Sequence, residues 1–94
     1  LQIARIQEIK SAVKIPLVLH GGSGVTDSDF VAAIKAGISI IHINTEIRLA
    51  WKKGIAEGLA ASMNEVAPYK ILEPSLRNMK AIITARLALF SGIK

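Results

Sequence analysis

Two short runs of apolar and β-branched residues, separated by a helical pattern, constrain this chain more than any other feature. Residues 16–20 lie between a proline and a Gly-Gly pair, and residues 38–44 follow a glycine. The first run is short and mainly apolar and the second is rich in β-branched isoleucine, which is typical of parallel strands that are buried on both faces. Strands that alternate with helices predict βαβ crossovers. A sheet of two strands cannot bury both faces of these runs, and it leaves its edges open. The elements therefore resemble consecutive pieces of a larger α/β barrel or sheet.

Helical patterns surround these strands. Apolar residues at helical spacing predict helices over residues 1–13, 27–36, 45–63 and 74–90. Thr26, with Asp29 three positions later, resembles a capping box, and Gly37 suits a helix C-terminus. We expect a turn over residues 67–73, so that the last helix begins at Pro74. Trp51 lies on the apolar stripe of its helix and is expected in the core.

Composition excludes several classes of protein. The chain has 94 residues, of which 51% are apolar, two histidines and no cysteine. Disulfide scaffolds and cysteine zinc sites are therefore excluded, and no apolar run is long enough to span a membrane. The net charge is +5, but the cations are scattered and not interleaved with aromatic residues, which argues against nucleic-acid binding. The chain begins with Leu1, inside a predicted helix, which suggests a truncated product.

Polar residues follow both predicted strands, at the strand ends where α/β folds collect function. The first group is His20, Gly21, Gly22, Ser23 and Gly24. Glycine allows a ligand to approach the backbone closely, so the loop N–H groups, the Ser23 hydroxyl and the following helix N-terminus form a plausible phosphate cradle. A simple turn between strand and helix would explain the same glycines.

The second group is His42, Ile43, Asn44 and Thr45. Alternation along a strand places His42 and Asn44 on one face, so His20, His42 and Asn44 can converge if the two strands are neighbours. A single histidine at a strand end is more often a structural residue than a metal ligand. A catalytic zinc needs at least three protein ligands, so any zinc site would draw further ligands from outside this chain.

These residues together resemble the class II, zinc-dependent fructose-bisphosphate aldolases and the related tagatose-bisphosphate aldolases. The resemblance extends over essentially the whole chain and rests on residues 15–25, 36–38, 43–46 and 85–87. It implies a (β/α)8 TIM barrel, of which residues 1–94 would be the C-terminal segment, an incomplete barrel. Residues 16–20 would be strand seven and residues 38–44 strand eight, with their flanking helices.

The resemblance also implies roles for individual residues. His20 would be the last of three histidines that bind the catalytic Zn²⁺, and Gly21, Gly22 and Ser23 would contact the phosphate of dihydroxyacetone phosphate. The stretch His42, Ile43, Asn44 and Thr45 matches the second phosphate and substrate segment. The general acid/base carboxylate and the other two zinc histidines would lie earlier in the protein, so this segment holds no catalytic acid or base.

The sequence departs from the family pattern in two places. Where the family usually has Lys and Asn before its Asn/Asp-Thr pair, this chain has Ile40 and His42. His42 can still donate a hydrogen bond, but the substrate preference is open. Near the tail, Tyr69 replaces an Arg that reaches the second phosphate in a neighbouring subunit, and Lys70 is a possible substitute.

The expected function is zinc-dependent, reversible aldol cleavage of a ketose bisphosphate, such as fructose 1,6-bisphosphate, in the intact enzyme. We expect a cytoplasmic glycolytic lyase of carbohydrate metabolism, a dimer or tetramer, that binds a phosphorylated sugar and neither nucleic acid nor membrane. The isolated segment is expected to be inactive. The alternatives are a non-catalytic phosphate-binding module that completes its sheet by self-association, and a basic nucleic-acid-binding module.

Overall fold

The computed structural model describes residues 1–22 and 24–92. Its elements, in chain order, are α1 (Ile3–Val13), β1 (Leu17–Leu19), α2 (Asp27–Ala36), β2 (Ile38–Ile41), α3 (Thr45–Ala61) and α4 (Pro68–Ser91). They fall into two compact units, Leu1–Ile43 with Ala88–Lys94, and Asn44–Leu87. The α/β alternation predicted from the strand runs is confirmed, although both strands are shorter than predicted because pairing stops before each polar end. None of the described helices is long and apolar enough to cross a membrane.

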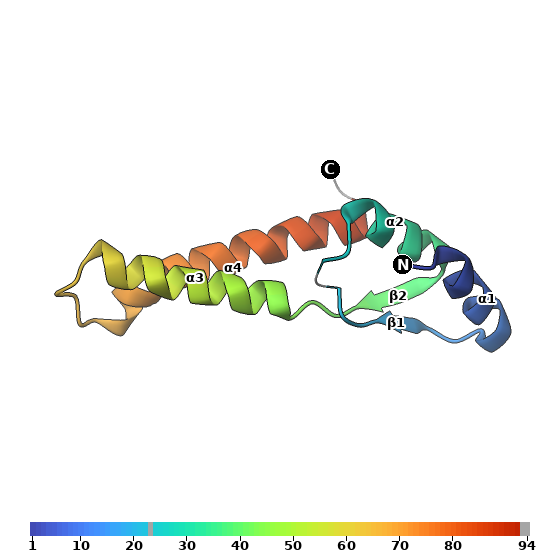
Figure 1. Ribbon diagram of the computed structural model, residues 1–94, viewed down its shortest axis with the longest axis horizontal. Coiled ribbons are helices and arrows are strands. Elements are labelled where there is room, and N and C mark those ends of the chain that lie inside the picture. The colour runs from blue at the N-terminus through green and yellow to red at the C-terminus, as the bar shows by residue number, and fades with distance from the viewer. Residues whose placement is uncertain (23, 93–94) are drawn as a thin grey trace. The chain divides into compact units, whose positions relative to one another are not determined.

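The first unit contains a two-stranded parallel sheet, with α2 packed against β2 and α1 packed against α2 (Figure 1). Its core is small and comes from α2 and the start of β2: Phe30, Ala33, Ala36 and Ile38. Phe30 is fully buried and meets Phe90 edge-on, with ring centroids 5.1 Å apart. Val18 and Ile40, one from each strand, remain 40% and 46% exposed. The sheet thus leaves apolar strand surface uncovered, as expected for two strands alone.

The two strands pair in a register that contains one irregularity. Leu17 lies opposite Ile38, but Val18 lies opposite Ile40 and Leu19 opposite Ile41, so β2 has one residue more than β1 over this stretch. The additional residue is Ser39. Such a β-bulge shifts every later pair by one position.

Local signals define α2 as the sequence predicts. The Thr26 hydroxyl accepts a hydrogen bond from the Asp29 N–H at 3.2 Å, which satisfies one free donor at the helix start. Gly37 ends the helix at φ 127°, a conformation that favours glycine, and its N–H donates to Ala33 O and Ile34 O. The loop after β1 therefore connects to a helix with well-defined ends.

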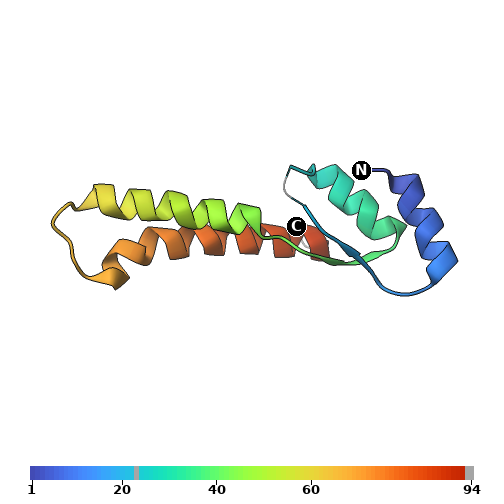
Figure 2. The ribbon, with the colours of Figure 1, turned by 60° about the horizontal axis from the view of Figure 1, so that its bottom comes forward.

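The second unit contains two antiparallel helices, α3 and the main part of α4 (Figure 2). They approach closely at two glycines of α3. A Cβ added to Gly54 would collide with the backbone of Ser75, and one added to Gly58 would collide with the Ile71 carbonyl. At the first contact the Ser75 hydroxyl, 1% exposed, donates to Trp51 O at 2.7 Å.

The turn predicted over residues 67–73 is wrong, because α4 begins at Pro68 and contains Pro74 in its interior. A proline at the first helical position loses no hydrogen bond, since that N–H has no intrahelical partner. The Ala67 carbonyl already accepts the N–H groups of Lys70 and Ile71, so the helix has closed its first turn before Pro74. Pro74 forfeits one backbone bond and is buried.

The predicted core position of Trp51 is also wrong in this unit, where the side chain is 48% exposed. Leu59, two turns after Trp51 on the same helix, is 55% exposed. The helix predicted over residues 45–63 ends at Ala61, so Met63 lies beyond α3 and is 90% exposed. The reason for the exposure of Trp51 and Leu59 is the glycine contact, because α3 turns its smallest residues toward α4. The apolar stripe of α3 is therefore largely uncovered in the described part of the chain.

Candidate functional site at the strand ends

His20 and His42 lie next to each other immediately after β1 and β2. Their rings pack edge to face, with centroids 4.6 Å apart and an interplanar angle of 85°. The His42 N–H donates to Leu19 O at 3.0 Å, one backbone hydrogen bond beyond the last residue of β2. Both histidines are exposed. The predicted convergence of these two residues at the strand ends is confirmed.

The glycine loop after His20 has the backbone that a tight turn requires. Gly21 and Gly24 have φ values of 65° and 82°, in the left-handed region, and Val25 N–H donates to Gly22 O at 3.2 Å. Gly22 is buried, and a Cβ there would come within 2.9 Å of Ile43 Cδ1 and 3.1 Å of Phe30 Cζ. A side chain at this position would require Ile43 or Phe30 to shift, so the loop backbone lies directly against the core. Ser23, the predicted phosphate contact, lies outside the described residues.

The N-terminus of α2 is less suited to an anion than the loop that precedes it. Thr26 already accepts the Asp29 N–H, and Asp27 and Asp29 place two carboxylates in the first turn. Negative side chains at this position use the favourable end of the helix dipole. A phosphate would therefore depend on the loop N–H groups rather than on α2.

The remaining predicted residues follow His42 directly in the chain. Ile43 belongs to the first unit and lies against Gly22. Asn44 and Thr45 belong to the second unit: Asn44 precedes the first turn of α3, its carbonyl accepts the Arg48 N–H, and its side chain makes no capping hydrogen bond. Thr45 is the first residue of α3, as predicted, and is exposed.

Sequence reasoning missed an ion pair within the second unit. Arg86 Nε donates to Glu46 Oε2 at 2.8 Å, and Arg86 Nη2 donates to Glu46 Oε1 at 2.6 Å. The Arg86 side chain is 22% exposed and the Glu46 side chain 18%. The partners are 40 residues apart, and no local spacing rule connects them. A bidentate pair of this kind fixes the start of α3 to α4.

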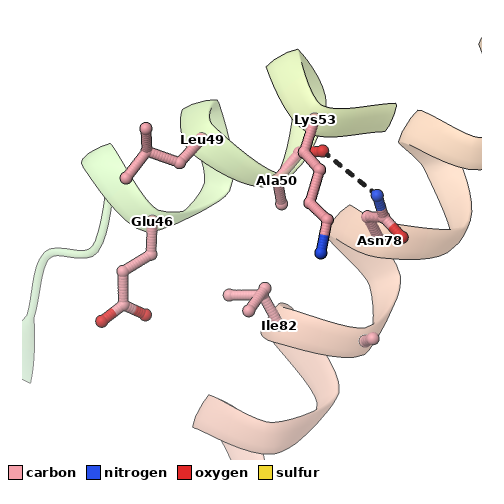
Figure 3. A pocket seen from close by; sticks show the side chains of 7 residues that line it. Glu46, Leu49, Ala50, Lys53, Asn78 and Ile82 are labelled. Atoms are coloured by element: carbon pink, nitrogen blue, oxygen red, sulfur yellow. Dashed lines mark hydrogen bonds between the residues drawn. The ribbon is translucent and has the colours of Figure 1, made fainter. Parts of the chain in front are cut away.

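A groove of about 440 Å³ lies between α3 and α4 beside this ion pair (Figure 3). Its lining residues are Glu46, Leu49, Ala50, Lys53, Asn78, Ala81 and Ile82. The Lys53 side chain extends into the groove, and Asn78 Nδ2 donates to Ala50 O at 3.5 Å. Most of the lining is aliphatic and Glu46 is neutralised by Arg86, so the groups suited to chemistry are those at the strand ends.

The donor set of the strand-end site suits part of a metal centre. Two imidazoles, exposed and in contact, offer nitrogen donors of the type that zinc prefers. Within residues 1–22 and 24–92, no three His, Cys, Asp or Glu side chains are close enough together to hold a metal ion. A complete centre would need ligands from beyond this chain.

Comparison with protein families identifies the chain. Residues 1–93 match the family model described as fructose-bisphosphate aldolase class-II. The chain belongs to this family. The resemblance inferred from the His-Gly-Gly-Ser-Gly and Asn-Thr segments is thereby confirmed.

Curated aldolases and a solved structure are similar to the chain. A fructose-bisphosphate aldolase of Geobacillus stearothermophilus is 37% identical over 92 residues, which cover 98% of this chain and 32% of that protein. A sulfofructosephosphate aldolase of Alkalicoccus urumqiensis is 44% identical over 61 residues, covering 65% and 21% respectively. The X-ray crystal structure of the YdjI aldolase from Escherichia coli K12 matches with a TM-score of 0.78 at 28% identity, covering 96% of this chain and 33% of that one. The chain thus spans about a third of the length of the relatives that it matches over its whole extent.

Proposed function

We propose that this chain forms the C-terminal part of a (β/α)8 barrel in a zinc-dependent class II aldolase that cleaves a ketose bisphosphate. In this proposal β1 and β2 are barrel strands seven and eight, and residues 1–94 form one segment of the barrel domain. The observation that carries the proposal is the family match over residues 1–93, together with a histidine pair at the ends of two adjacent parallel strands. Active sites of barrel enzymes lie at this end of the strands.

His20 would hold the metal through a ring nitrogen. Its place directly after β1 supports this role, because the sheet restrains its backbone while the side chain stays exposed. When bound, zinc supplies a Lewis acid for the substrate carbonyl. The other ligands and the acid/base carboxylate would come from earlier parts of the protein.

The glycine loop and the start of α3 would hold the substrate phosphate. Backbone N–H groups of Gly21 and Gly22, the hydroxyl of Ser23, and the polar groups of Asn44 and Thr45 would donate to phosphate oxygens, with His42 and Ile43 beside the substrate. The left-handed Gly21 and the buried Gly22 support this, since they form a loop whose backbone a ligand can approach. Contacts to a remote phosphate orient the reacting carbons.

The decisive experiment is His20→Ala in the intact protein that carries this chain. We expect bound zinc to be lost and the rate of fructose 1,6-bisphosphate cleavage to fall by more than about 100-fold. Loss of a residue that only supports a metal ligand already costs about 10–100-fold, and loss of the ligand itself should cost more. Gln7→Ala on the exposed face of α1 is the control and keeps both properties. Retention of zinc and activity by His20→Ala would refute the assignment of His20.

The substrate is tested in the same preparation. Fructose and tagatose bisphosphates and a sulfonated ketose phosphate are compared by kcat/KM, since relatives of this chain carry names for both bisphosphate and sulfo-sugar aldolases. We expect a ketose bisphosphate to be preferred. Cleavage of none of the three would contradict the proposed activity.

A further inference from the structure

We propose that His42 is a positioning residue for His20: its ring packs against the His20 imidazole and holds it in the orientation that presents a nitrogen to the metal. This inference rests on the proposed role of His20. It assigns His42 a function in metal binding that is separate from any hydrogen bond to substrate.

The register of the sheet places the two rings together. At the start of the sheet the paired residues are 21 positions apart in the sequence, from Leu17 to Ile38, but after Ser39 they are 22 apart, as in Leu19 and Ile41. Continued by one residue, this register sets His20 opposite His42. Without the additional residue on β2, Ile41 would lie opposite His20. Directly opposed residues of neighbouring strands share a face, so their side chains meet.

Two interactions restrain the pair. The rings adopt the edge-to-face geometry that aromatic systems favour, with 4.6 Å between centroids, and the His42 backbone is held by its hydrogen bond to Leu19 O. Among the described residues, the structure places the His42 ring directly against the His20 ring, where it can restrain the ring orientation. In most metal sites a hydrogen-bond acceptor next to the ligand fixes the orientation of a histidine ring. In this proposal the packed ring of His42 does so.

The inference predicts that the ring of His42, rather than its nitrogen atoms, controls metal affinity. In the intact protein, His42→Ala should raise the dissociation constant for zinc about tenfold, the cost typical of losing an outer-shell partner. His42→Phe keeps an aromatic ring at the same place and should stay within about twofold of the wild type. Its KM for substrate should still rise, because Phe cannot donate a hydrogen bond.

The measurement is competition with a chromophoric chelator at fixed pH, followed by the visible absorption of the Co²⁺-substituted protein. We expect the Co²⁺ bands of His42→Ala to shift and those of His42→Phe to match the wild type. Ile41→Val, on the other face of β2, is the matched control and should change neither quantity. His42→Leu, similar in volume but not aromatic, should behave as His42→Ala and replaces it if that variant unfolds.

Unchanged zinc affinity in His42→Ala and His42→Leu would overturn the inference. So would equal losses in His42→Phe and His42→Ala, since the nitrogen atoms would then matter rather than the ring contact. His20→Ala is measured in parallel. If it binds zinc as the wild type does, the proposed function fails at His20 itself, a result distinguishable from failure at His42.

Discussion

The close approach of α3 and α4 can be tested with Gly54→Ala. Whether this exchange lowers or raises the free energy of unfolding decides whether the two helices pack as described. The added Cβ would collide with the Ser75 backbone in α4. Backbone atoms cannot rotate away, and the Ser75 side chain is held by its hydrogen bond to Trp51 O at 2.7 Å. The two helices must therefore separate to accommodate one methyl group.

Two opposing contributions set the change in the free energy of unfolding. Alanine is favoured over glycine in a helix interior by about 0.5–1 kcal/mol. Overpacking costs about 1–3 kcal/mol, and separation of the helices also strains or breaks the Ser75 hydrogen bond, worth about 1 kcal/mol. We expect the sum to lower the free energy of unfolding by about 1–3 kcal/mol.

The assay is urea unfolding of the protein, followed by circular dichroism, with Ala56→Gly as the matched control. Ala56 is exposed on α3, so this exchange changes helix propensity alone and should cost about 1 kcal/mol. A Gly54→Ala protein as stable as the wild type, or more stable, would refute the close packing of α3 against α4. Propensity would then be the only effect at work.

Two further predictions concern the helix ends and the ion pair. Thr26→Ala should destabilise the protein by about 1 kcal/mol in thermal unfolding, because it removes the acceptor of the Asp29 N–H, and Thr26→Ser should not; equal losses in both would exclude the capping role. Arg86→Met should cost about 2 kcal/mol, because it leaves the Glu46 carboxylate mostly buried without its bidentate partner. Adding Glu46→Gln should recover part of that loss, and additive effects in this double-mutant cycle would show that the two side chains are not coupled.

Local chemistry explains which elements could be predicted from the sequence. The residues at both ends of α2 are polar or glycine and act within one turn of the helix, so Thr26 and Gly37 define its bounds as predicted. Pro74 misled the prediction because proline is favoured at the first position of a helix, so the last helix was expected to begin there. That rule considers only the helix itself and ignores its neighbour, whereas here Ile71 and Ser75, on either side of Pro74, lie against Gly58 and Gly54 of α3.

The same contact explains the error at Trp51. An apolar stripe predicts the buried face of a helix when large side chains make the interface. In α3 the interface with α4 is made by glycines at a spacing of four residues, which carry little weight in a hydropathy pattern. In the sequence, two small residues one turn apart were the only sign of this glycine face. Trp51 and Leu59 dominated the hydropathy pattern and are exposed in the described unit.

The candidate site shows where prediction by spacing stops. The ends of the two runs in the sequence placed His20 and His42 at strand ends. Which residue lies opposite His20 depends on the register of the strands, and a slip of one position would put Ile41 there in place of His42. The register depends on Ser39, which has no distinguishing local signal and contributes only an additional residue to β2. His20 and His42 are therefore coupled through the backbone of the sheet. Deletion of one residue from β2 would separate the two rings, even if every residue of the His-Gly-Gly-Ser-Gly and Asn-Thr segments were kept.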